Sequence, residues 1–166
     1  MTIWRQLAAV IVLPGTVAFA VPAVILWRDG IHIVWWPAAA ALGVTLIAIG
    51  LVLIVRTIAL FAEVGRGTLA PSDPTKRLVV RGPYRYVRNP MISGVLFVLL
   101  GEAALFGSLP LLVWFGVVAA VNAVYLPLVE ERGLRRRFGE DYEAYRANVP
   151  RWIPRLRPWN GEESAR

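Results

Sequence analysis

The chain has 166 residues, of which 57% are hydrophobic, and a formal net charge of +7. A mean hydropathy of +0.58 is too apolar for an ordinary water-soluble domain and indicates an integral membrane protein. The absence of cysteine excludes a disulfide framework, a thiolate metal site and a cysteine nucleophile. We expect no metal site, because cysteine is absent and His32 is the single histidine. We expect no nucleic-acid partner, because the basic residues stand beside apolar segments, where anionic lipid headgroups are nearer.

The first apolar run extends from about residue 7 to 27 and contains Pro14 and Pro22. Membrane helices tolerate proline, so we expect this run to span the bilayer with a kink. A cleavable leader is the alternative, because Arg5 precedes the run and Ala18-Phe19-Ala20 resembles a cleavage site.

A second apolar run, residues 33–55, opens with Trp35 and Trp36, whose rings suit the membrane interface. Together the two runs predict an N-terminal transmembrane hairpin over residues 1–56. The next segment, residues 56–89, is basic and rich in proline and glycine, which favours an ordered loop over a long helix.

Two further apolar runs, residues 90–106 and 109–129, are joined by a short turn and form a second hairpin. The sequence therefore predicts an all-α integral membrane protein with about four transmembrane helices. Four crossings place the N-terminus, the basic loop and the C-terminal tail on one side, which the positive-inside rule assigns to the cytoplasm. We expect a multi-pass protein of the cell membrane.

The C-terminal tail, residues 130–166, begins with a predicted amphipathic helix. Leu134, Phe138, Tyr142 and Tyr145 recur in it at near-helical spacing. We expect this stripe to dock the helix on its own protein or on the membrane interface, in preference to forming a cofactor site.

Residues 81–90 read Arg-Gly-Pro-Tyr-Arg-Tyr-Val-Arg-Asn-Pro and end where the third apolar run begins. Asn89 is a good N-cap and Pro90 suits the first helical position. Free amides at the positive end of the helix favour an anionic group there. The alternative is that Asn89 only caps the helix while Arg85 and Arg88 meet lipid phosphates.

Two adjacent carboxylates, Glu130 and Glu131, close the last apolar run. Carboxylates next to hydrocarbon are costly unless partnered, which favours a functional role. Antiparallel packing of the last two spans would bring Asn89 beside Glu130. Helix-end amides, arginines, tyrosines and a carboxylate together suit a zwitterionic, aromatic and partly cationic ligand.

These segments resemble a known family. Residues 82–90 look like the cofactor loop of isoprenylcysteine carboxyl methyltransferases and of bacterial membrane phospholipid-methyltransferase-like proteins. The tail is similar to that family's C-terminal signature in order and spacing, with Glu130-Glu131, Phe138-Gly139, Asp141-Tyr142, Tyr145 and Val149-Pro150-Arg151-Trp152-Ile153-Pro154. The resemblance covers about residues 68–155 and does not extend to the first hairpin.

The resemblance implies a membrane-embedded methyltransferase that uses S-adenosyl-L-methionine. Its acceptor would be a lipophilic small molecule or lipid with a carboxylate, an amine or a similar group. The methyltransferase-like region would be residues 57–166, with a cofactor loop at 68–92. Carried over by position, Arg151 is the candidate catalytic residue, and the cofactor-binding residues are Lys76, Arg77, Leu78, Val79, Tyr84, Arg85, Arg88, Asn89, Pro90, Met91, Ile92, Glu130 and Glu131.

Three positions depart from the family pattern. Asn89 stands where many members have histidine, and Ile92 where a tyrosine is usual. Leu126 stands where the prenyl-protein enzymes carry an arginine thought to contact the substrate, which weakens the assignment of a prenylcysteine carboxylate as acceptor. Two polar residues inside the spans, Glu102 and Asn122, are expected to pair with each other or to line an acceptor tunnel.

Two other functions stay open on the sequence alone. A membrane reductase related to the sterol reductases would hold NAD(P)H with the same arginines. A non-enzymatic scaffold would use its basic segments to bind anionic lipid. Lipid binding does not require that the arginines and tyrosines of residues 81–90 face a pair of glutamates. Methyl transfer is therefore the leading hypothesis.

Overall fold

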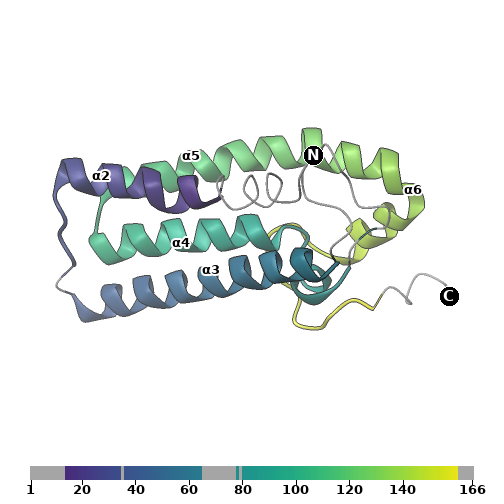
Figure 1. The fold of residues 1–166 in the computed structure, drawn as a ribbon, viewed down its shortest axis with the longest axis horizontal. Coiled ribbons are helices and arrows are strands. Elements are labelled where there is room, and N and C mark those ends of the chain that lie inside the picture. The colour runs from purple at the N-terminus through teal and green to yellow at the C-terminus, as the bar shows by residue number, and fades with distance from the viewer. Residues whose placement is uncertain (1–13, 35, 65–77, 79, 161–166) are drawn as a thin grey trace.

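The computed structural model describes residues 14–34, 36–64, 78 and 80–160. These residues form helices and connections, with no strand among them, as predicted for the fold class. In chain order the elements are η1 (Thr16–Ala20), α2 (Val21–Asp29), α3 (Pro37–Val64), η2 (Gly82–Arg85), α4 (Pro90–Phe106), α5 (Leu109–Tyr125), η3 (Leu126–Glu130) and α6 (Glu131–Asn148). Figure 1 shows α3, α4 and α5 side by side, with α2 along α5 and α6 at one end.

Two helices are long and apolar enough to cross a membrane, Pro37–Leu60 in α3 and the segment that begins with α5 at Leu109. Helix α4 is apolar but shorter. Only 17% of the most apolar stretch of α3 and 11% of that of α5 are buried inside the protein, whereas the core helix of a soluble domain would be covered. The outward apolar surface is therefore compatible with lipid contact, as expected for a helical membrane protein.

Helix α3 extends further than the second predicted span. It continues past Arg56 to Val64, although the proline- and glycine-rich segment beyond had predicted a loop from residue 56 onward. The reason is local, because the first glycine of that segment is Gly65 and the intervening residues are compatible with a helix. Thr57 is fully buried and its hydroxyl donates to the Leu53 carbonyl at 2.7 Å, so the predicted boundary between the two regions lies inside an unbroken helix.

Glycines bring α3 and α4 into backbone contact at two levels. Gly43 lies opposite Gly101, and Gly50 lies opposite Gly94. In each helix the two glycines are seven residues apart, which is nearly two turns and returns them to the same face. A Cβ atom added to Gly50 would come within 2.5 Å of the Gly94 carbonyl oxygen. Small residues of this kind allow close helix packing without a large apolar core.

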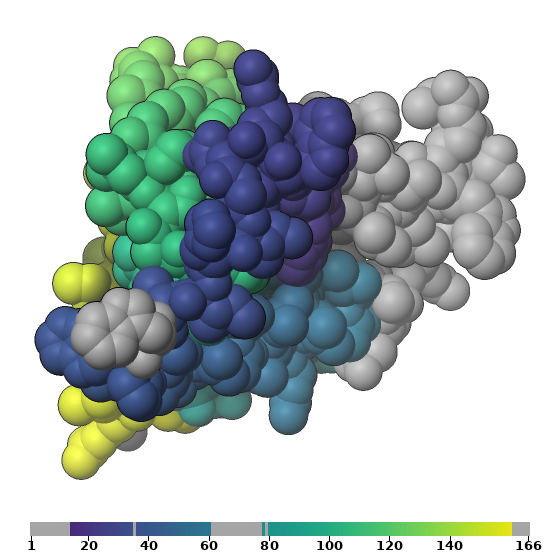
Figure 2. Space-filling view, turned by 90° about the vertical axis from the view of Figure 1, so that its left-hand side faces the viewer, coloured from purple at the N-terminus to yellow at the C-terminus, as the bar shows by residue number. Residues whose placement is uncertain are grey.

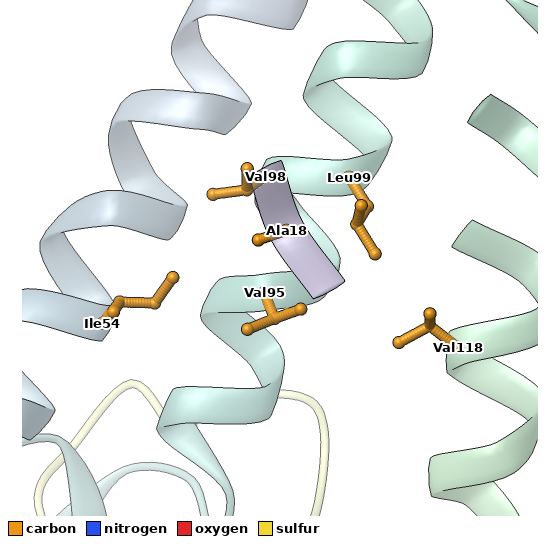
Figure 3. Close-up of a cluster of buried hydrophobic side chains, with 6 residues drawn as sticks. All are labelled: Ala18, Ile54, Val95, Val98, Leu99 and Val118. Carbon is orange, nitrogen blue, oxygen red and sulfur yellow. The ribbon is translucent and has the colours of Figure 1, made fainter. Parts of the chain in front are cut away.

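Helix α4 lies at the centre of the buried core. Val95 and Val98 on this helix are 4% and 0% exposed, and side chains from three other elements pack around them. Figure 3 shows the cluster, which comprises Ala18 of η1, Ile54 of α3, Val95, Val98 and Leu99 of α4 and Val118 of α5. The start of α4 is thereby held firmly at the end of the bundle where α6 lies.

Element η1, which leads into α2, is a wide helical turn that is attached to α5. The Val21 amide donates to the Thr16 carbonyl, five residues back, as in a π-helix. In the same register the next donor would be Pro22, which has no N–H, so the Val17 carbonyl lacks that partner. The indole N–H of Trp114 donates to this carbonyl at 3.0 Å. Figure 2 shows the molecule from the end opposite α6, with α2 lying beside α5.

Candidate functional site

Residues 81–89, here called the arginine-tyrosine loop, lie against residues 149–159, here called the C-terminal segment. Both are at the α6 end of the bundle (Figure 1). Three backbone bonds join them, Arg88 N–H to Pro150 O at 2.9 Å, Arg155 N–H to Tyr86 O at 2.9 Å and Trp159 N–H to Arg85 O at 3.0 Å. The Arg85 side chain also donates to the Trp159 carbonyl at 3.0 Å. The loop therefore has its conformation set by the tail.

An aromatic cluster lies next to the contact between the arginine-tyrosine loop and the C-terminal segment. Tyr142 and Tyr145 of α6 are 1% and 3% exposed, and they pack with Val149 and Trp159. The Tyr145 hydroxyl donates to the Tyr84 carbonyl at 2.8 Å. Leu78, Val80, Leu134 and Phe138 border the cluster. The apolar stripe of the tail therefore packs on the protein itself, which is one of the two docking alternatives expected from the sequence.

Glu131 is buried and surrounded by arginines. Its side chain is 6% exposed, and Arg88 donates to Oε1 at 3.0 Å. Arg151 makes a two-point contact, from Nε to Oε1 at 2.7 Å and from Nη2 to Oε2 at 3.0 Å. Arg146 lies 3.7 Å from Oε2. Hydrogen bonding to Glu131 raises the pKa of Arg151, and both carboxylate oxygens of Glu131 are already engaged.

Glu130 differs from its neighbour. It is partly exposed, and within the described part of the chain no hydrogen bond or ion pair reaches its carboxylate. Burial raises its pKa, and the adjacent Glu131 raises it further. Element η3 ends at Glu130 and makes a π-helical turn in which the Glu131 amide donates to the Leu126 carbonyl. This wide turn, which accommodates Pro127, rotates the glutamates relative to the apolar face of α5.

Tyr84 and Tyr142 border the same region. Burial is the main cause that raises the pKa of Tyr84, with smaller contributions from Tyr145 and Glu130. For Tyr142 burial and then Glu131 raise the pKa to about 12, against an opposing effect of Arg88. Both hydroxyls therefore keep their protons at neutral pH and can donate hydrogen bonds.

Asn89 occupies the N-cap position of α4, as predicted, but its side chain makes no capping hydrogen bond. Its carbonyl accepts the first helical bond, from Ser93 N–H at 2.9 Å. Pro90 has no N–H, and the amides of Met91 and Ile92 precede the first intrahelical donor. The Arg88–Glu131 ion pair shows that the start of α4 lies beside the start of α6. Because α6 follows α5 and η3, this is the arrangement expected when α4 and α5 pack antiparallel.

The remaining predicted residues differ in whether the structure describes them and in what they contact. Lys76, Arg77 and Val79 lie outside the described residues. Leu78 is partly buried and packs on the aromatic cluster. Glu102 and Asn122 do not pair as expected, because the Asn122 amide donates to the Val118 carbonyl at 2.8 Å and one Glu102 oxygen is buried without a partner among the described residues.

Two residues of the site escaped the sequence analysis, Arg146 and Trp159. A bulky aromatic in an otherwise polar terminal segment was a usable signal for Trp159, which is 5% exposed. For Arg146 there was none, since its distance from Glu131 depends on how α6 folds around Gly139, where the backbone has φ 50° and ψ −123°.

Comparison with known families matches residues 38–141 to the phospholipid methyltransferase model. The chain belongs to this family. The match begins in α3, so the estimate that the resemblance excluded the whole first hairpin was wrong, and the glycine contacts between α3 and α4 lie inside the family region. No curated protein and no solved structure matches the chain. Family membership supports a membrane methyltransferase in general, and members of this family generally use S-adenosylmethionine.

Proposed function

We propose that this protein transfers a methyl group from S-adenosylmethionine to a lipophilic acceptor, and that the methyl donor binds where the arginine-tyrosine loop, the start of α4 and Glu130 meet. The main support is that, among the described residues of the matched family region, this meeting point combines the unpartnered Nε of Arg88 with the carboxylate of Glu130, which no described residue pairs with. The proposal deepens the family assignment by naming a site and an acceptor class.

The available groups suit an amino-acid moiety. The Nε of Arg88 is buried without a partner in the described part of the chain, and the Met91 and Ile92 amides lie at the positive end of α4. These donors complement a carboxylate. Glu130 complements an ammonium group or a ribose hydroxyl, and Tyr84 contributes an aromatic surface. The residues present therefore fit the methyl donor.

S-adenosylmethionine, when bound, supplies a methyl group on a positively charged sulfur, which a nucleophile can take by direct displacement. The contribution of the protein is to hold donor and acceptor in line and to exclude water. The side of the site that holds the methyl donor would be formed by Arg85, Arg88, Asn89, Pro90 and Glu130. Arg151 stays the candidate catalytic residue, although its Nε and Nη2 are engaged by Glu131.

The acceptor we favour is a phospholipid amine. The family description names phospholipids, and that supports a lipid acceptor. Leu126 is 1% exposed and uncharged, so this position offers no cation to a carboxylate acceptor. A carboxylate acceptor of the prenylcysteine type is accordingly the less favoured choice.

We further propose a multi-pass topology in which the N-terminus, the basic loop and the tail face the cytoplasm. Helix α6 and the C-terminal segment lie at one end of the bundle (Figure 1), and both are rich in arginine, which is the pattern expected of a cytoplasmic face. Membrane lipids would then border the exposed apolar sides of α3 and α5. The family match lends no support to an NAD(P)H-dependent reductase or to a scaffold.

The test is calorimetric titration of the detergent-solubilised protein with S-adenosylmethionine, S-adenosylhomocysteine and NADPH. We expect saturable binding of the two sulfur nucleotides, a large loss in Glu130→Ala and no change in the control Glu143→Ala, since Glu143 is half exposed on α6. Binding of NADPH alone, or no binding by folded protein, would contradict the proposal. A positive result leads to a methylation assay with phosphatidylethanolamine vesicles.

A further inference from the structure

The two adjacent glutamates have opposite environments. Glu131 is buried and holds Arg88 and Arg151 by hydrogen bonds, with Arg146 nearby. Glu130 is partly exposed and has no ion-pair partner in the described chain. Adjacent residues on a helix point about 100° apart, so one carboxylate can face the protein while the other faces a ligand.

The arginines that meet at Glu131 come from separate segments. Arg88 belongs to the arginine-tyrosine loop and directly precedes the N-cap of α4. Arg151 belongs to the C-terminal segment, which lies beyond residue 141, where the family match ends. The backbone bond from Arg88 N–H to Pro150 O joins the same two segments. A single carboxylate therefore connects the loop, the tail and α6.

We propose that Glu131 is a positioning residue: it ties the arginine-tyrosine loop to the C-terminal segment and so sets the geometry of the methyl-donor site, whereas Glu130 contacts the ligand. The inference rests on the proposed function for the role of Glu130. It also makes the C-terminal segment, although outside the matched family region, a required part of the site.

Electrostatics favours this division of roles. Arg88 is 11% exposed, and Glu131 is the carboxylate it pairs with among the described residues, so removing the charge of Glu131 would take away this counter-ion. Loss of one partner of a buried ion pair is far more disruptive than loss of an exposed pair. The matched exposed carboxylate is Glu143, which is 52% exposed and pairs with the exposed side chains of Arg135 at 2.7 Å and Arg146 at 3.5 Å.

The experiment measures loop closure and ligand binding separately. Hydrogen exchange of the Arg88, Arg155 and Trp159 amides, which bridge the loop and the tail, is followed in detergent without any nucleotide. We expect Glu131→Gln to speed their exchange on the order of a hundredfold, and Glu130→Gln and the control Glu143→Gln to leave it unchanged. Calorimetry on the same variants then gives the affinity for S-adenosylhomocysteine.

The affinity should fall at least about tenfold in both Glu130→Gln and Glu131→Gln, with faster amide exchange only in Glu131→Gln. Glu131→Asp, which keeps the charge, should recover part of both losses. If Glu131→Gln weakens binding with no change in exchange, Glu131 contacts the ligand directly and the inference is wrong. If exchange rises while affinity stays the same, Glu131 has only a structural role, and the inference is likewise wrong.

Two further outcomes are separated by this design. If Glu131→Gln does not fold, Arg151→Lys replaces it, since lysine keeps the charge but loses the two-point contact, and the same faster exchange is expected. If the wild-type protein binds no sulfur nucleotide, the proposed function and the ligand role of Glu130 are wrong, while the exchange data still decide whether Glu131 joins the loop to the tail.

Discussion

Replacement of Gly50 by alanine tests whether the glycine contacts determine the packing of α3 on α4. The new Cβ atom would lie 2.5 Å from the Gly94 carbonyl oxygen, 2.8 Å from a Val98 methyl group and 2.9 Å from the Val98 nitrogen. Ordinary contacts begin near 3.4 Å, so the helices would have to separate by about 0.9 Å, the difference between 3.4 and 2.5 Å. Because two of the three atoms are backbone, rotation of a side chain cannot relieve the clash.

The expected cost follows from two opposing effects. Overpacking costs about 1–3 kcal/mol, whereas alanine is favoured over glycine in a helix by roughly 1 kcal/mol. We therefore expect Gly50→Ala to lower the free energy of unfolding by up to about 2 kcal/mol, and by about 1–3 kcal/mol relative to a glycine-to-alanine change in open space. The matched control is Gly116→Ala on α5, where an added Cβ meets nothing within 4 Å.

The assay is equilibrium unfolding of both variants in detergent micelles, followed by circular dichroism. Gly116→Ala should equal or exceed the wild type in stability, and Gly50→Ala should fall below it. Equal stability of the two alanine variants would refute the argument that α3 and α4 are in backbone contact at this level.

Two other predictions concern single structural features. Trp114→Phe removes the donor to the Val17 carbonyl and should cost about 1–2 kcal/mol in the same unfolding assay, whereas Trp27→Phe, at a residue that is 82% exposed, should have little effect; equal losses would contradict the bond. Gly139→Ala should destabilise α6 by roughly 1–2 kcal/mol because alanine is strained at φ 50°, while Gly133→Ala on the same helix, also in open space, should be neutral or stabilising.

Local chemistry was sufficient to predict much of the fold. Apolar runs of membrane length predicted α3, α4 and α5 and their helical class, since the period and length of such runs depend only on neighbouring residues. The predicted end of the second span, at residue 55, was wrong because nothing between Arg56 and Val64 breaks a helix. The position of Asn89 at the start of α4 was right, but the expected side-chain cap is absent.

Only part of the candidate site could be predicted from the local sequence. Motif spacing singled out the arginine-tyrosine loop and the glutamate pair, and the family match supports the function that they suggested. The sequence analysis placed both Glu130 and Glu131 among the cofactor-binding residues, however, because adjacent identical residues have nearly the same local sequence. Their separation into a buried ion-pair centre and a partly exposed carboxylate depends on the turn at η3 and on arginines from distant segments.

The sequence by itself determined that this protein is helical and compatible with a membrane, and it singled out residues 81–90 and the glutamate pair as the candidate site. Hydrophobicity, charge and helix capping are properties of short segments, so they can be evaluated without a fold. Only the tertiary structure decided that the C-terminal segment holds the loop, that Glu131 joins Arg88 to Arg151, and that Gly50 meets Gly94. Those relations join residues far apart in the chain, and the distances between them exist only once the helices have packed.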